Sequence, residues 1–137
     1  MSNRTAGNFG LLILRIGIGG VFLLFGIDKL QAPSNWIIYL PSQLGQFIQS
    51  SGFLTVIQFL RIQGFVEAAL GVQILLGCMT RWSAAASSLA LAAIVYCIGL
   101  DQIGIRDTGL LSAALAIAIL GPGDWSVDAW LSRRDVK

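Results

Sequence analysis

The stretch that decides the fold is FLTVIQFLRIQGFVEAALGVQILLGCMT, residues Phe53 to Thr80. Between Ile62 and Thr80 its only charged residue is Glu67. A segment this long and this apolar is typical of a membrane-spanning helix, which needs about 20 residues to cross a bilayer. An ionised carboxylate in hydrocarbon costs at least ~2.5–3.5 kcal/mol. We therefore expect Glu67 to face the protein interior and to have a partner there.

The composition is that of a membrane protein. Of the 137 residues, 55% are hydrophobic and only 12% are charged, whereas about a quarter of the residues in soluble domains are charged. Three long runs, residues 30–60, 82–100 and 108–123, contain no charge. At this length we expect a single membrane domain over residues 1–137. The net charge of +2 is too small and too dispersed to indicate a nucleic-acid partner.

Four apolar segments predict an all-α fold, a transmembrane four-helix bundle. Their expected bounds are residues 9–30, 53–79, 82–100 and 107–121. The tail that follows, residues 122–137, is polar. The bundle is expected to carry an interfacial or re-entrant segment, residues 31–52, between its first two spans.

The first span has one distinctive face. Five of its residues recur at three- and four-residue spacing, namely Arg15, Gly19, Phe22, Gly26 and Lys29. Residues at this spacing share one side of a helix. We expect that side to pack against a neighbouring helix, because small residues there allow close approach.

The segment 31–52 is polar but uncharged. Pro33 and Pro41 interrupt any helix there, and Trp36 and Tyr39 suit the headgroup region of a membrane. Two interpretations stay open for this segment. It is either an interfacial piece lying on the membrane, or a lid over a cavity in which Trp36 and Tyr39 contact a ligand.

Seven ionisable residues form the candidate site, a buried polar network or ligand pocket. They are Glu67, Arg106, Asp107, Arg61, Asp28, Lys29 and Arg15. At ~1.5 Å rise per residue, the short fourth span places Arg106 at nearly the depth of Glu67. Because helical side chains lean toward their own N-terminus, we expect Glu67 to pair with Arg106. Arg15 leans the other way and is expected to extend to the headgroups.

The cysteines and the absence of histidine limit the chemistry. The chain has no histidine and only two cysteines, Cys78 and Cys97, which are far apart in sequence. It therefore lacks the His ligands of haem, zinc and copper sites and the thiol pair of a redox exchange centre. We expect no metal site, no catalytic residue and no cofactor held by this chain alone. The charged network either locks the helices together or lines a site for a ligand or proton.

The basic residues at the ends of the spans predict an orientation. On one side are Arg4, Arg81, Arg133, Arg134 and Lys137, against Lys29 and Arg106 on the other. The positive-inside rule then places both termini in the cytoplasm. We expect a multi-pass protein of the inner membrane or another bioenergetic membrane.

Three stretches resemble the DoxX family of small four-span membrane proteins. They are LLILRIGIGGVFLLFGIDKL (residues 11–30), FVEAALGVQILLGCMTRWSAAA (residues 65–86) and RDTGLLSAALAIAILGPGDWSVDA (residues 106–129). Ten residues fall on the family pattern: Arg15, Lys29, Glu67, Gly71, Arg81, Arg106, Asp107, Gly121, Pro122 and Gly123.

The residues and the resemblance together leave three hypotheses for function. The first is an accessory or scaffold subunit of a larger membrane complex, possibly redox or bioenergetic, whose partners are lipid and other membrane subunits. The second is the membrane subunit of a quinone-linked oxidoreductase, with the quinone bound near Glu67, Arg106 and Asp107. The third is a small-solute transporter or an assembly chaperone. Quinone and lipid are the candidate ligands.

Overall fold

The computed structural model describes residues 3–134, and over that range its regular elements are all helices. They are α1 (Asn3–Gln31), the 3-10 helix η1 (Pro33–Tyr39), α2 (Ser42–Ser51), α3 (Val56–Leu76), α4 (Thr80–Ile98), α5 (Gln102–Leu120) and α6 (Val127–Arg134). Four of them, α1, α3, α4 and α5, are long and apolar enough to cross a membrane. The predicted all-α fold is confirmed.

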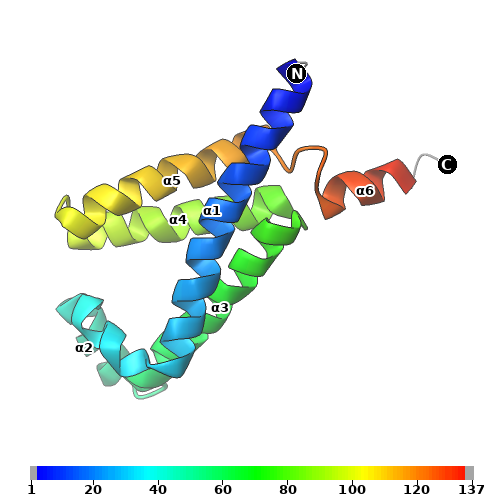
Figure 1. The fold of residues 1–137 in the computed structure, drawn as a ribbon. Helices are drawn as coiled ribbons and strands as arrows, with labels where there is room; N and C mark the ends of the chain where they lie inside the picture. The colour runs from blue at the N-terminus through cyan, green and yellow to red at the C-terminus, as the bar shows by residue number, and fades with distance from the viewer. Residues whose placement is uncertain (1–2, 135–137) are drawn as a thin grey trace.

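The four long helices form two antiparallel pairs (Figure 1). In the first pair α1 packs along α3, and in the second α4 packs along α5. The pairs lie at a steep angle to each other and meet near the connection between α3 and α4, while their other ends separate. The segments η1 and α2 lie at the separated ends.

Four glycines allow α1 and α3 to approach closely. A Cβ atom at Gly26 would lie 2.6 Å from the carbonyl oxygen of Gly64, and one at Gly71 would lie 2.8 Å from that of Gly19. Both distances are far shorter than a carbon–oxygen contact, so the two backbones touch as in other small-residue helix contacts. The predicted face of α1 is confirmed, because Arg15, Gly19, Phe22, Gly26 and Lys29 are all buried.

A hydrophobic cluster forms where the two pairs meet. Its buried members come from all four long helices: Ile18, Phe22, Ile74, Ala84, Leu91, Ala114 and Ile117. The cluster fixes the angle between the pairs at this end. The separated ends are left free to enclose a space.

The segment between α1 and α3 folds into two short helices. Pro33 lies in the first turn of η1, and Pro41 immediately precedes α2, the positions in which a missing N–H is tolerated. Ile48 of α2 packs against Leu60 of α3 in a second small cluster, which also includes Trp36. The segment therefore folds back onto the helix pair.

The fourth span begins earlier than predicted. The helix α5 starts at Gln102 rather than near residue 107, because Asp101 caps it. The Asp101 carboxylate accepts a hydrogen bond of 2.8 Å from the backbone N–H of Gly104, which satisfies one of the unpaired donors of the first turn. Arg106 and Asp107 therefore lie within the helix.

Arg15 does not extend to the headgroups, and that prediction is wrong. Its guanidinium is buried and donates to four carbonyl oxygens: those of Ile74 (2.9 Å), Leu75 (2.8 Å), Pro122 (3.0 Å) and Trp125 (2.8 Å). The last carbonyls of a helix have no partner within the helix and attract cations. Arg15 thus joins α1 to the end of α3 and to the segment after α5.

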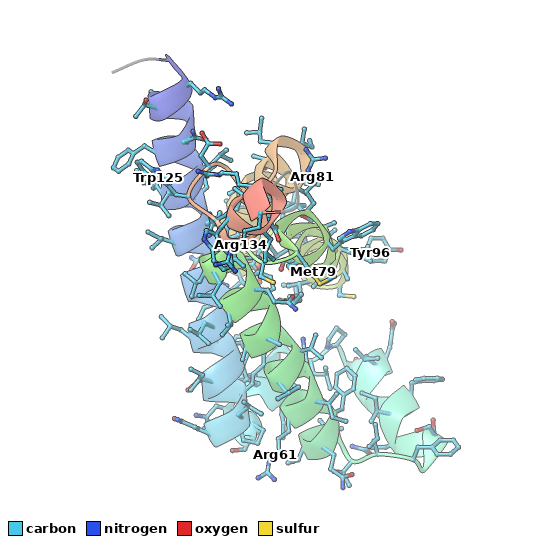
Figure 2. The ribbon with its side chains drawn as sticks, turned by 90° about the vertical axis from the view of Figure 1, so that its right-hand side faces the viewer. Arg61, Met79, Arg81, Tyr96, Trp125 and Arg134 are labelled. Atoms are coloured by element: carbon cyan, nitrogen blue, oxygen red, sulfur yellow. The ribbon has the colours of Figure 1, made fainter. Side chains whose placement is uncertain are left out.

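The C-terminal helix α6 lies beside the α3–α4 connection, which contains Met79 (Figure 2), and Asp128 fastens it there. The Asp128 carboxylate accepts hydrogen bonds from the backbone N–H groups of Met79 (2.8 Å) and Thr80 (2.9 Å) and from the Thr80 hydroxyl (2.9 Å). Burial by itself raises the pKa of Asp128, but these hydrogen bonds and the charge of Arg15 outweigh it. The net pKa is lowered, so the ionised form is stabilised at the start of α4, where negative charge is favourable.

Candidate functional site

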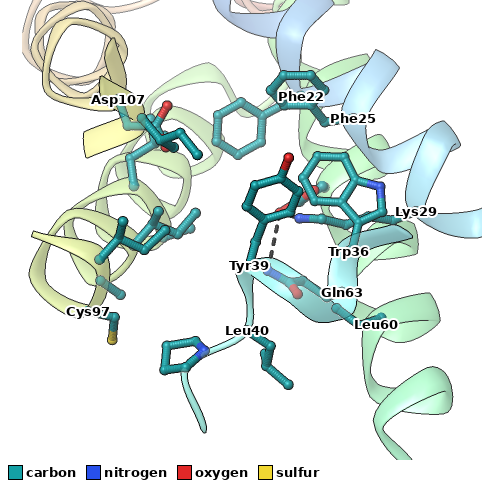
Figure 3. Close-up of a pocket in the computed structure, with 18 of the residues that line it drawn as sticks. Phe22, Phe25, Lys29, Trp36, Tyr39, Leu40, Leu60, Gln63, Cys97 and Asp107 are labelled. Atoms are coloured by element: carbon teal, nitrogen blue, oxygen red, sulfur yellow. Dashed lines mark hydrogen bonds and ion pairs between the residues drawn. The ribbon is translucent and has the colours of Figure 1, made fainter. Parts of the chain in front are cut away.

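A cavity of about 670 Å³ lies between the separated ends of the two helix pairs (Figure 3). All four long helices line it, and η1 contributes to its wall. Most of the lining is apolar, including Phe22 of α1, Leu60 of α3, Ile94 of α4 and Leu110 of α5. The volume falls in the range of ~300–1,000 Å³ that is usual for small-molecule sites.

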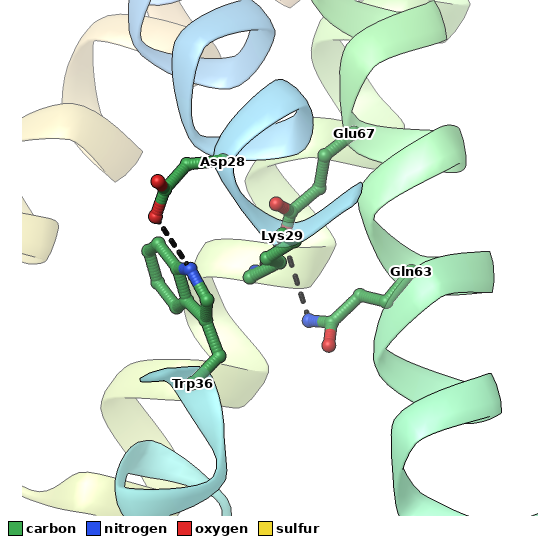
Figure 4. Close-up of polar contacts among 5 residues, drawn as sticks. All are labelled: Asp28, Lys29, Trp36, Gln63 and Glu67. Atoms are coloured by element: carbon green, nitrogen blue, oxygen red, sulfur yellow. Dashed lines mark hydrogen bonds and ion pairs between the residues drawn. The ribbon is translucent and has the colours of Figure 1, made fainter. Parts of the chain in front are cut away.

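A buried ion pair forms part of this wall (Figure 4). Lys29 Nζ lies 2.6 Å from Glu67 Oε1, and only 6% and 10% of the two side chains are exposed. Gln63 Nε2 donates a longer bond of 3.3 Å to the same oxygen. The other oxygen, Oε2, is buried and has no hydrogen-bond partner within residues 3–134.

The predicted partner of Glu67 was Arg106, and this prediction is wrong. Lys29 and Glu67 each lie three residues after one of the contacting glycines, Gly26 and Gly64. At that spacing each side chain lies on the same face as its glycine. The close backbone contact therefore brings Lys29 and Glu67 together directly, before any residue of the second helix pair can reach them.

The second ion pair lies on the opposite wall. Arg106 Nε donates to Asp107 Oδ1 (2.9 Å), and Arg106 Nη2 lies 2.8 Å from the same oxygen. The Arg106 side chain is 53% exposed, whereas that of Asp107 is 6% exposed. The Arg106 guanidinium carbon lies 5.6 Å from the centre of the Phe25 ring on α1. Charge and aromatic surface thus span the cavity from α5 to α1.

The 3-10 helix η1 is held against the cavity by its aromatic residues. Trp36 Nε1 donates to Asp28 Oδ2 at 2.7 Å, and Lys29 Nζ lies 4.6 Å from the centre of a Trp36 ring. Trp36 also contacts Phe25 (5.4 Å between ring centres) and Tyr39 (5.7 Å). Such contacts add about 0.5–1.5 kcal/mol each beyond burial. Trp36 and Tyr39 both line the cavity.

Five of the seven predicted site residues line the cavity: Asp28, Lys29, Glu67, Arg106 and Asp107. Arg61 and Arg15 do not. Arg61 is exposed near the start of α3, far from the end where Arg15 is buried. Arg61 precedes Glu67 by six residues, which corresponds to about 240° around a helix, so the two residues cannot share a face.

Gln63 and Phe25 are two of the lining residues that the sequence analysis did not place in the site. Gln63 lies four residues before Glu67, a spacing at which helical side chains interact, so this contact was open to prediction. Phe25 carries no comparable signal, because an aromatic residue in an apolar span is usually part of the lipid-facing or packed surface. Within the part of the chain that the structure describes, no group of three His, Cys, Asp or Glu side chains is placed to hold a metal ion.

A family model supports the resemblance seen in the sequence. The DoxX model matches residues 10–100, about two thirds of the chain. Neither a curated protein nor a solved structure gives a match. The matched range includes Lys29, Trp36 and Glu67 and ends before the Arg106–Asp107 pair. With this match and its four long apolar helices, the chain belongs to the DoxX family of membrane proteins.

Proposed function

We propose that this protein is the membrane subunit of a quinone-linked oxidoreductase complex and that its cavity holds the quinone headgroup. The observation that carries the proposal is the combination of a largely apolar cavity between apolar helices with two ion pairs in its wall. Binding sites for small molecules typically pair an apolar enclosure with a few fixed polar groups.

The chemistry of the lining suits a flat ring with polar edges. The rings of Phe25, Trp36 and Tyr39 offer an aromatic wall on which a quinone ring can stack or meet an edge. The Lys29–Glu67 and Arg106–Asp107 pairs place charged groups in the wall beside which its oxygens can lie. A ligand that dissolves in the bilayer can reach a cavity enclosed by membrane-spanning helices without crossing water.

We infer that the electrons come from a partner subunit. The sequence contains no histidine and no vicinal cysteine pair, so it lacks the usual protein ligands and exchange thiols of redox centres. On this proposal the chain is not an enzyme by itself. It works with other membrane or membrane-attached subunits in the inner membrane or another bioenergetic membrane, with both termini in the cytoplasm.

The binding of quinone tests the proposal. Purified protein in lipid nanodiscs is titrated with a short-chain benzoquinone, and quenching of tryptophan fluorescence gives Kd. Ala93 lines the cavity on α4, and we expect Ala93→Phe to weaken binding about tenfold or more by filling the space. Ala86 is exposed on the same helix outside the cavity, so Ala86→Phe should leave Kd unchanged. Equal effects of the two variants, or no binding, would contradict the proposal.

A scaffold or accessory subunit is the second candidate. It is supported by the buried charges, which join α1 to α3 and hold η1 in place. The glycines do not support packing against helices of other proteins, because Gly19, Gly26, Gly64 and Gly71 pack within the chain. Purification from the native membrane in mild detergent separates the candidates, since stoichiometric partner subunits without quinone indicate a scaffold. A chain that emerges alone and empty points instead to a transporter or assembly chaperone.

A further inference from the structure

We infer that the cavity binds the reduced, hydroquinone form of its ligand more tightly than the quinone form. This inference rests on the proposed function and concerns the same cavity. It rests on the hydrogen-bonding groups in the wall: donors there are already bonded within the protein, whereas carboxylate oxygens are free to accept.

The donors of Lys29 and Trp36 are already engaged by the protein, and the other donors of the wall, on Asn35, Tyr39, Gln63 and Arg106, are exposed or partly buried. Lys29 Nζ is bonded to Glu67 and lies over the Trp36 ring. Trp36 Nε1 is bonded to Asp28. Arg106 has further N–H groups, but its side chain is 53% exposed. A bond from Arg106 to a ligand therefore replaces a bond to water and adds little net free energy.

The free acceptors are carboxylate oxygens. Glu67 Oε2 is buried without a hydrogen-bond partner among the described residues. Arg106 meets Asp107 at Oδ1, which leaves Oδ2 free to accept, although Oδ2 is not among the fully buried atoms without a partner in residues 3–134. Glu67 and Asp107 belong to different helix pairs and both line the cavity. The buried polar part of the wall thus accepts hydrogen bonds on both sides of the ligand space.

The two redox forms of the ligand differ in what they offer such a wall. A quinone carries two carbonyl oxygens, which only accept hydrogen bonds and repel a carboxylate oxygen. A hydroquinone carries two hydroxyl groups, each of which can donate a short, charge-assisted bond to a carboxylate. One hydrogen bond to a charged group corresponds to a factor of about ten or more in affinity.

Selective binding of the reduced form alters the redox equilibrium of the bound ligand. If hydroquinone binds about tenfold more tightly, the midpoint potential of the bound two-electron couple rises by about 30 mV relative to the free couple. A quinone held in this cavity would then accept electrons more readily than the quinone in the surrounding membrane. The wall of the chain would contribute to the driving force without carrying electrons itself.

The test uses three molecules with the same ring and tail in nanodiscs holding the whole chain. They are a decyl-substituted benzoquinone, the same molecule in its hydroquinone form kept anaerobic, and the dimethyl ether of that hydroquinone, which has no hydroxyl donor. We expect Kd of the hydroquinone to be about tenfold lower than those of the quinone and the ether. Equal values, or tighter binding of the quinone, would overturn this inference and leave the proposed function intact. If none of the three binds, both fail.

A variant of Asp107 tests whether this carboxylate causes the preference for hydroquinone. In Asp107→Asn one carboxylate acceptor becomes an amide that also donates, and the partly exposed Arg106 remains solvated. We expect the ratio of quinone Kd to hydroquinone Kd to fall about tenfold. Asp124 is exposed and lies outside the cavity, so Asp124→Asn should keep the wild-type ratio. An unchanged ratio in a folded Asp107→Asn protein would exclude Asp107 as the acceptor. The comparison with the ether needs no variant.

Discussion

The ammonium nitrogen of Lys29 lies 2.6 Å from Oε1 of Glu67, and this pair joins α1 to α3 at the wall of the cavity. Locking helices and lining a ligand site are therefore not exclusive roles for the buried charges. The pair exists because Gly26 and Gly64 bring the two backbones into contact one turn away. The same contact that closes the helix pair sets the polar group at which a ligand can bind.

Removing one member of this pair should be strongly destabilising. Lys29→Met leaves Glu67 buried without a countercharge, which typically costs about 3–5 kcal/mol. The double variant Lys29→Met with Glu67→Leu should recover most of that loss, because it leaves no buried charge. Circular dichroism during unfolding in detergent measures the stability of the single and the double variant. Arg61 is exposed on α3, the helix that carries Glu67. Arg61→Met should change stability by less than about 0.5 kcal/mol. Equal losses for Lys29→Met and Arg61→Met would contradict the buried pair.

A methyl group at the α1–α3 contact should separate the helices. At Gly26, a Cβ atom would lie 2.6 Å from the Gly64 carbonyl oxygen, whereas at Gly20 on the same helix it meets nothing within 4 Å. We expect Gly26→Ala to lower the free energy of unfolding by about 1–3 kcal/mol through overpacking. Gly20→Ala should be neutral or slightly stabilising, since alanine favours a helix. The unfolding midpoints of the two variants are compared with that of the wild type. An unchanged midpoint for Gly26→Ala would show that the backbones of α1 and α3 are further apart.

Asp128 should make the stability depend on acid. Its pKa is lowered in the folded protein, so its contribution is complete above the unfolded value of about 3.9 and is lost as the pH falls through the lower folded value. At pH 6, Asp128→Asn should be less stable than the wild type by up to about 1 kcal/mol, because it removes a negative charge at the start of α4. The difference should shrink below pH ~4. Unfolding followed from pH 6 to pH 3 tests this, and a difference independent of pH would exclude the carboxylate as its source.

Much of the fold could be predicted from hydrophobicity and spacing. The apolar segments located the four long helices, and the spacing from Arg15 to Lys29 identified the buried face of α1. The prolines at positions 33 and 41 indicated that the segment after α1 would be broken. These features depend on local sequence and on the lipid environment, which act on each helix by itself.

The partners of the buried charges could not be predicted in the same way. Depth along a helix suggested Arg106 for Glu67, but depth does not say which helices touch or on which face. The contact of Gly26 with Gly64 brings Lys29, and not Arg106, within reach of Glu67. Likewise Arg15 meets carbonyl oxygens near positions 74 and 122, which belong to segments far apart in sequence. The steep angle between the two helix pairs, and hence the cavity, also depends on such long-range contacts.

Cysteine labelling should locate the two ends of the molecule on opposite sides of the membrane. Arg81 and Arg134 lie toward one end of the structure and Arg61 lies at the other (Figure 2), so the positive-inside rule favours cytoplasmic termini. In a background without Cys78 and Cys97, both free thiols, a cysteine replaces exposed Ser132 of α6 or exposed Ser50 of α2. A membrane-impermeant maleimide added to intact cells should label the Ser50→Cys protein. It should label the Ser132→Cys protein only after the membrane is opened. The reverse pattern would invert the orientation. Labelling of both from outside would mean that η1, α2 and α6 lie on one face, which four membrane-crossing helices do not allow.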